Sequence, residues 1–165
     1  MERLQTILDI YSNWAEDILG QQIPIEWHNS FGAWVFEYEE GWKVWIGMIA
    51  HEDDILELPL YFANRFETPS LIEIPFHIIA FLHEIGHLKT WDEDYQNEEE
   101  KAIIRKNLDW VGYRLLLNEE AADLWAADYM LNHSTKMRKY IKLLEQAYRK
   151  VTFEDLQEYL EIHPF

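Results

Sequence analysis

The chain has 165 residues, of which 48% are hydrophobic and 15% aromatic, and this composition argues against a disordered segment and for one folded domain over residues 1–165. It contains no cysteine, which excludes disulfides and thiolate metal sites, so any transition metal has to be bound by imidazole and carboxylate groups. The formal net charge of −17 makes direct nucleic-acid binding unexpected, because a negative surface repels phosphates.

The first part of the chain predicts one helix followed by strands. Apolar residues recur every three or four positions over Leu4–Leu19, which is the spacing of an amphipathic helix, and Gly20 is a typical helix end. Aromatic and β-branched residues are then concentrated in three short segments that favour strands. These segments are Ile23–His28, Ala33–Glu39 and Trp42–Ala50.

Turn residues and a proline indicate how the strands of this sheet are arranged. Glu40 and Gly41 are typical of a tight hairpin turn, so we expect an antiparallel arrangement. A further strand is expected at Ile55–Ala63. Pro59 assigns that strand to an edge, since proline cannot donate a ladder hydrogen bond. An edge strand could bind a substrate peptide as an added strand.

The rest of the chain is predicted to be helical. The run Leu71–Leu88 is apolar on nearly every side, which indicates a buried central helix. A charged loop is expected at Asp92–Glu100, helical patterning resumes over residues 102–131, and Ser134 and Thr152 are candidate N-caps of two closing helices. The expected fold class is therefore α+β: a mostly helical single domain with a small antiparallel sheet before the central helix.

The central helix carries the motif HExxH as His83-Glu84-Ile85-Gly86-His87. On a helix the i, i+4 spacing places His83 and His87 on one face, close enough to share a tetrahedral metal ion. Glu84 is one position round from that face, where it can act as a general base without being a ligand. Three such groups in an apolar helix would cost several kcal/mol without a partner, so the setting favours a metal site.

A catalytic zinc requires a third protein ligand. The segment after His87 lacks the glycine and the histidine of the longer HExxHxxGxxH motif, so a glutamate is the expected ligand. A later helix offers Glu119, with Glu120 as the alternative, in apolar surroundings. Asp123 lies four positions after Glu119 and could orient a ligand histidine through its second ring nitrogen.

These two motifs resemble those of the gluzincin metallopeptidases. His83-Glu84-Ile85-Gly86-His87 followed by Asn118-Glu119-x-x-Ala122-Asp123 is similar to the HExxH and NExx(S/A)D pair of that group, and the short chain also resembles the ImmA/IrrE-like peptidases. The resemblance covers about the central third of the chain. It implies a zincin-like fold, zinc as cofactor, ligands His83, His87 and Glu119, Glu84 as base, and Asp123 as the residue that supports a ligand.

The sequence also suggests roles for several residues outside the two motifs. His77 is expected to be a buried structural or helix-end histidine. An oxyanion could be stabilised by one of three side chains, namely His133, Tyr113 and Tyr129. Gly86 has no side chain, so another backbone element can approach it, and we expect an edge strand, Trp42–Ala50 or Ile55–Ala63, in that place.

The predicted function is zinc-dependent hydrolysis of peptide bonds, in which Glu84 removes a proton from a water molecule and passes it to the leaving amine. The expected partner is a protein or peptide substrate, and the acidic surface and the family resemblance point to a basic DNA-binding regulator. No signal peptide or membrane-spanning run is evident, so we expect a soluble, cytoplasmic protein without membrane contact. The alternatives are an inactive acidic binding protein or DNA mimic on the same fold, and a structural zinc protein.

Overall fold

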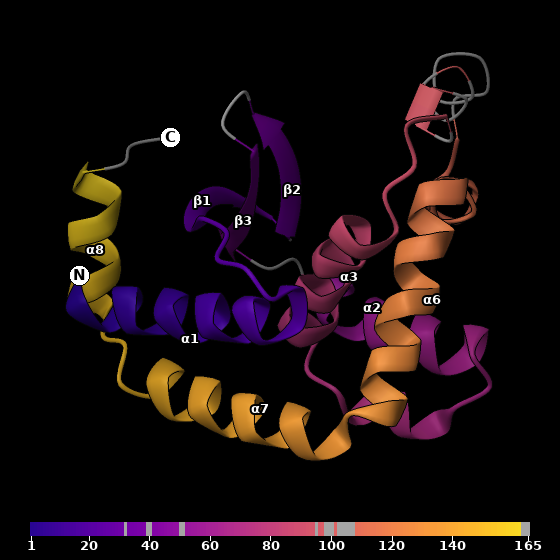
Figure 1. Ribbon diagram of the computed structural model, residues 1–165. Helices are drawn as coiled ribbons and strands as arrows, with labels where there is room; N and C mark the ends of the chain where they lie inside the picture. The colour runs from indigo at the N-terminus through magenta and orange to yellow at the C-terminus, as the bar shows by residue number, and fades with distance from the viewer. Residues whose placement is uncertain are drawn as a thin grey trace. The chain divides into compact units, whose positions relative to one another are not determined.

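The computed structural model describes residues 1–31, 33–38, 41–49, 52–94, 96–97, 101 and 108–162 (Figure 1). The chain divides into two compact units. The first comprises Met1–Ile55 and His133–Phe165, and the second comprises Leu56–Asn132. The expectation of one domain over residues 1–165 stays a prediction.

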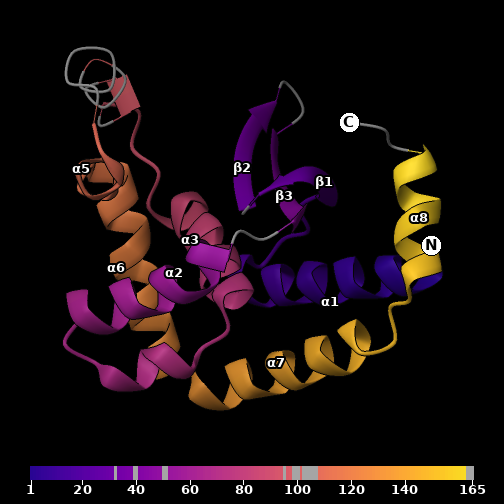
Figure 2. The same cartoon turned by 180° about the vertical axis from the view of Figure 1, so that it is seen from behind.

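Two helices lie side by side in the first unit: α1 (Glu2–Leu19) and α7 (Ser134–Tyr148) (Figures 1 and 2). The buried side chains of α1 recur at helical spacing, as predicted, and Trp14 stacks on Tyr140 of α7 with ring centroids 4.9 Å apart. Gly20 ends α1 in the left-handed conformation with φ 74°. The buried aromatic stack thus joins segments that lie far apart in the sequence.

The last helix, α8 (Phe153–Ile162), begins after the predicted cap. The Asp155 carboxylate accepts from the Thr152 backbone N–H at 2.9 Å, and the Thr152 hydroxyl accepts from the Asp155 N–H at 3.4 Å. Thr152 therefore caps α8 as predicted. Ser134 is instead the first residue of α7, and His133 holds the cap position.

The sheet of the first unit has three strands in the order β1-β3-β2: β1 (Ile25–Phe31), β2 (Ala33–Tyr38) and β3 (Gly41–Ile49). The β2–β3 pair is antiparallel, as expected, but β1 runs parallel to β3, so the prediction of a purely antiparallel sheet was wrong. Turn residues indicate that consecutive strands reverse and do not indicate which edge a strand joins. The central strand β3 buries Val44 and Ile46 on one face of the sheet, and its two edges pair with β2 and β1. Glu40, part of the predicted turn, lies outside the described residues.

The predicted edge strand at Ile55–Ala63 is wrong, because this segment is part of helix α2 (Glu52–Arg65), most of which belongs to the second unit. Three buried residues, Pro59, Phe62 and Ala63, follow the i, i+3, i+4 spacing of a helix rather than the alternation of a strand. Pro59 lies within the helix, where it leaves one carbonyl without its usual donor. Burial of this apolar face outweighed the local preference of proline.

The predicted central helix is shorter than its apolar run. Pro69–Glu73 forms a 3₁₀ turn, η1, and α3 begins only at Phe76 and ends at Thr90. Ile74 is extended, with φ −79° and ψ 125°, because the ring of Pro75 disfavours helical backbone in the preceding residue. The motif itself lies on α3, as predicted.

The later helical segment is also interrupted. Within residues 108–132 it forms α5 (Trp110–Arg114) and α6 (Leu117–Asn132) rather than one continuous helix. Asp109 starts α5 by accepting a hydrogen bond from the Gly112 N–H at 2.7 Å. Within the predicted loop Asp92–Glu100, the described residues Glu93, Asp94, Gln96 and Asn97 are helical, so the expectation of a loop was wrong there. Tyr95, residues 98–100 and residues 102–107 lie outside the described part of the chain.

Helices α3 and α6 pack closely in the second unit, side by side in both views (Figures 1 and 2). The closest approach is at Gly86, where a Cβ atom would lie 2.6 Å from the Ala122 carbonyl oxygen. The backbone beside Gly86 is therefore that of α6. The expectation that an edge strand, Trp42–Ala50 or Ile55–Ala63, would approach this glycine was wrong, because a glycine admits any backbone and its sequence does not identify which one.

None of the helices in the described part of the chain combines the length and the apolar character that a membrane span requires.

The helix contact at Gly86 generates the first prediction. Gly86→Ala should gain about 1 kcal/mol in helix propensity but lose more through overpacking, so we expect a net destabilisation of about 1 to 2 kcal/mol in urea unfolding. Ala122→Gly should not rescue it, because the nearest atom is a backbone oxygen. A stabilised Gly86→Ala variant would contradict the contact.

His77, in the first turn of α3, generates the second prediction. Burial lowers its pKa from 6.5 to about 4, so the folded state holds this histidine neutral while the unfolded chain binds a proton below pH 6.5. Stability should therefore fall as the pH falls from 6.5 towards 4, by about 2.5 kcal/mol at pH 4.5. His77→Gln should unfold with a smaller loss between pH 7 and pH 4.5 than wild type. Equal losses in the two proteins would show that His77 does not contribute.

Candidate metal centre

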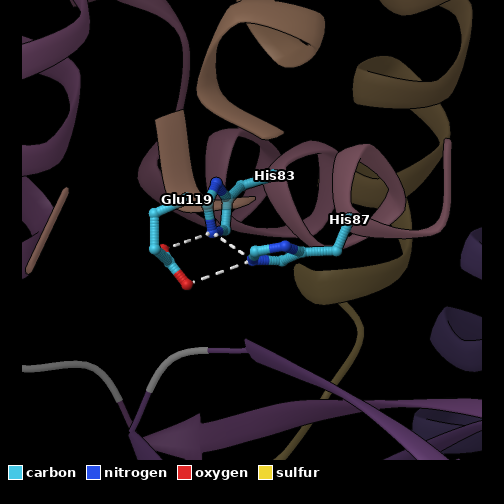
Figure 3. Close-up of side chains that lie close together, drawn as sticks. All are labelled: His83, His87 and Glu119. Atoms are coloured by element: carbon cyan, nitrogen blue, oxygen red, sulfur yellow. Dashed lines mark hydrogen bonds and ion pairs between the residues drawn. The ribbon is translucent and has the colours of Figure 1, made fainter. Parts of the chain in front are cut away.

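Two histidines of α3 and one glutamate of α6 converge in the second unit (Figure 3). His83 Nε2 lies 3.0 Å from His87 Nε2 and 3.2 Å from Glu119 Oε2, while His87 Nε2 lies 3.3 Å from Glu119 Oε1. All three side chains are buried. The structure therefore brings together the three predicted ligands, and this group could hold a metal ion.

The spacing of these atoms fits a tetrahedral cation. Ligand atoms at about 2.0 to 2.1 Å from a zinc ion lie roughly 3.3 Å from one another, and the observed separations are 3.0, 3.2 and 3.3 Å. A carboxylate oxygen and an unprotonated imidazole nitrogen both carry lone pairs, so their approach in a buried site is repulsive unless a positive species lies between them. Protons or a metal ion can supply that charge.

The pKa values of the ligand side chains also indicate that the cluster favours positive charge. Burial alone would lower the pKa of His83, but hydrogen bonds to the Asp123 and Glu119 carboxylates outweigh it and raise the pKa to about 9. Burial alone would raise the pKa of Glu119, but hydrogen bonds with His83 and His87 outweigh it and lower that pKa. The cluster thus favours bound positive charge, which is a proton on His83 when no metal is bound.

Asp123 contacts His83 as the sequence predicts. Its Oδ1 atom lies 2.9 Å from His83 Nδ1, and its side chain is only 1% exposed. An ionised carboxylate can only accept, so Nδ1 carries the proton and Nε2 is directed at the cluster. Asp123 therefore lies where it can orient a ligand ring, while its role stays a prediction.

Glu84 is buried on α3 beside the two histidines. Burial raises the pKa of its carboxyl, and the neighbouring His83 and His87 oppose this effect in part. A buried carboxyl with a raised pKa beside a ligand set has the properties of a proton acceptor for a water molecule.

The two candidate third ligands, Glu119 and Glu120, are separated by their position on α6. Glu119 faces His83 and His87. Glu120 instead pairs with Arg65 of α2, and both of these side chains are about one-third exposed, at 34% and 35%. Successive residues of a helix point about 100° apart, so only one of them can face the cluster.

The three residues predicted as possible oxyanion stabilisers lie in different places in the structure. The Tyr113 hydroxyl donates to Glu119 Oε1 at 3.0 Å, so this residue lies at the cluster. Tyr129 is ten positions beyond Glu119 on α6, about 15 Å along the axis, which exceeds the reach of a tyrosine side chain. His133 belongs to the first unit, where it is exposed at the N-cap of α7.

Two residues at the site were missed by the sequence analysis. Arg114 is buried against Asp123 and Glu119, and the Tyr61 hydroxyl donates to Asp123 Oδ2 at 3.4 Å. The sequence could have indicated Arg114, because it is a lone cation within the apolar segment before Glu119 and would need a carboxylate partner if it were buried. Tyr61 had none, because its segment was assigned to a strand.

Comparison of the chain with protein-family models, with curated proteins and with solved structures gives no match. The gluzincin resemblance therefore rests on the two motifs and stays a prediction.

The ligand cluster generates the third prediction. Protein purified without chelator should contain about one divalent metal ion per chain by elemental analysis, and His87→Ala and Glu119→Ala should lose it. Glu120→Ala is the matched control, since it removes the same charge one position along α6, and it should retain the metal. Equal loss from Glu119→Ala and Glu120→Ala would contradict the assigned ligand set.

Proposed function

We propose that this protein is a zinc-dependent metallopeptidase, with zinc bound by His83, His87 and Glu119 and with Glu84 as general base. The observation that carries the proposal is the buried Glu84 carboxyl beside a three-ligand cluster. A structural zinc site uses four protein ligands and needs no base, whereas a catalytic site uses three and leaves one position for a water molecule or substrate.

The donor set supports zinc as the metal. Two imidazole nitrogens and one carboxylate oxygen are the ligands of many hydrolytic zinc sites, and their separations are those of a tetrahedral ion. Calcium and magnesium prefer six or more oxygen ligands, which this cluster does not provide. Zinc is therefore the metal most consistent with the described residues.

The proposed mechanism assigns a task to each side chain. Zinc, when bound, supplies a lowered water pKa near 7 and polarises a carbonyl group. The Glu84 carboxylate accepts a proton from the attacking water and returns it to the leaving amine nitrogen, so that one proton is moved without net gain or loss. His83 and His87 remain neutral ligands through Nε2, and Asp123 keeps the His83 ring in place.

Tyr113 is the best-placed of the candidate oxyanion stabilisers. Burial and the adjacent Glu119 carboxylate raise the pKa of its phenol, so the hydroxyl stays protonated and able to donate at neutral pH. Its side chain is 42% exposed, which allows contact with a substrate, and it already reaches Glu119. We infer that it donates to the substrate carbonyl oxygen as negative charge develops there.

The proposed substrates are proteins or peptides, with basic segments favoured. The formal net charge of −17 attracts cationic partners and raises their rate of encounter. A basic regulatory protein would fit this preference.

Cleavage of a basic peptide should slow as the salt concentration rises, because salt screens the attraction between the acidic protein and its substrate. A cleavage rate that does not depend on salt would contradict this electrostatic steering.

Substitution of Glu84 tests the catalytic proposal. Glu84→Gln preserves shape and removes the base, so zinc content should stay near the wild-type value while peptide hydrolysis falls at least about 100-fold. The readouts are elemental analysis and cleavage of a fluorogenic peptide mixture. Glu120→Gln, at the solvent-facing neighbour of the ligand Glu119, is the control and should retain both properties. Undiminished hydrolysis by Glu84→Gln would exclude its role as base. A wild-type protein that hydrolyses no peptide would favour the acidic binding protein instead.

A further inference from the structure

A buried guanidinium lies behind the ligand cluster. Arg114 is 8% exposed, its Nε atom donates to Asp123 Oδ2 at 3.1 Å, and its Nη2 atom donates to Asp123 Oδ1. The planar fork of arginine matches both oxygens of a carboxylate, so the Asp123 side chain has one defined orientation. Nη1 also approaches Glu119 Oε2, at 3.5 Å.

The Arg114 guanidinium also lies at the contact between Asp123 and His83. Arg114 Nη2 lies 3.3 Å from His83 Nδ1, and both nitrogen atoms are directed at Asp123 Oδ1. Two donors therefore share one carboxylate oxygen, and the nitrogen–nitrogen approach is a consequence of that sharing rather than a hydrogen bond. The arrangement is closed by Tyr61, whose hydroxyl donates to Oδ2 and whose ring centroid lies 5.6 Å from Arg114 Cζ.

The support for the two ligand rings is unequal. His83 is held through Nδ1 by Asp123, whereas His87 Nδ1 is buried and has no hydrogen-bond partner among the described residues. Among the described residues, the Arg114–Asp123 pair therefore orients the His83 ring through Nδ1, and no corresponding contact orients the His87 ring.

We propose that Arg114 is a positioning residue of the metal centre, which holds Asp123 and through it the His83 ring, with Nε2 facing Glu119 and His87. The inference rests on the metal centre proposed above and concerns metal affinity rather than catalysis. It makes a prediction of definite sign. Coulomb's law requires that removal of a nearby cation strengthens the binding of a second cation to the folded, deprotonated site, so weaker zinc binding by a folded variant above the pKa of His83 indicates lost positioning.

The test is zinc affinity measured by competition with a chromophoric chelator. Arg114→Met should lower the affinity about 10- to 100-fold, and Arg114→Lys, which keeps the charge but not the fork, should also lower it. Arg65→Met is the matched control, because it removes the same charge from a residue that pairs with Glu120 on α6 but contacts no ligand. Its affinity should stay within about threefold of wild type. The visible spectrum of the cobalt-substituted Arg114→Met protein should differ from wild type, because the ligand geometry has relaxed.

The outcomes separate the two proposals. A wild type that binds no zinc removes the metal centre and this inference together. A wild type that binds zinc, with Arg114→Met equal to it or tighter, overturns only the role of Arg114. If Arg114→Met does not fold because Asp123 is left buried without a counter-ion, Asp123→Asn and the double variant decide. The two should bind zinc within about threefold of each other, and a further tenfold loss in the double variant would overturn the inference.

Discussion

The arrangement of the second unit depends on the close approach of α3 and α6 at Gly86. Because a side chain at this position would meet the Ala122 carbonyl oxygen at 2.6 Å, only glycine allows the two helices this separation. Gly86 lies between His83 and His87 in the sequence, and Ala122 lies one turn after Glu119. The contact that sets the helix separation is therefore also the one that brings the imidazoles within reach of the carboxylate.

The site concentrates lone pairs and negative charge in a buried volume, and its surroundings offset them. Asp123 and Glu119 are met by the Arg114 guanidinium, and the remaining excess of acceptors is satisfied by a positive species at the ligand atoms. With both carboxylates ionised, one arginine leaves a deficit of positive charge that a divalent ion would remove. The same balance explains why the pKa of His83 is raised despite its burial.

The neighbours of the cluster differ in their exposure, and the difference suits separate tasks. Asp123 and Arg114 are buried and are held by several hydrogen bonds, which suits groups that must not move. Tyr113 is partly exposed and makes one hydrogen bond to Glu119, which suits a group that exchanges partners when a substrate arrives. Rigidity and access are thus divided between consecutive residues of α5, Tyr113 and Arg114.

The sequence by itself determined the elements whose signals are local. The amphipathic period of α1, the β2–β3 pair and the HExxH spacing on α3 each follow from residues within one continuous segment of the chain. The pairing of Glu119 and Asp123 on one face of α6 follows in the same way. For these features the chain needs no distant partner to choose between conformations.

Only the tertiary structure decided the features in which distant groups compete. The helix α2 replaced a predicted strand because burial of Phe62 and Ala63 outweighed the preference of Pro59. Strand β1 runs parallel to β3 because the chain direction reverses twice between them and β1 pairs on the edge that β2 leaves free. The choice of Glu119 over Glu120 depends on the rotation of α6 against α3, and the contact of Arg114 with Asp123 joins residues nine positions apart on two helices. Local patterns carry no information on these contacts, because packing between elements, rather than the preference of any one residue, sets their energies.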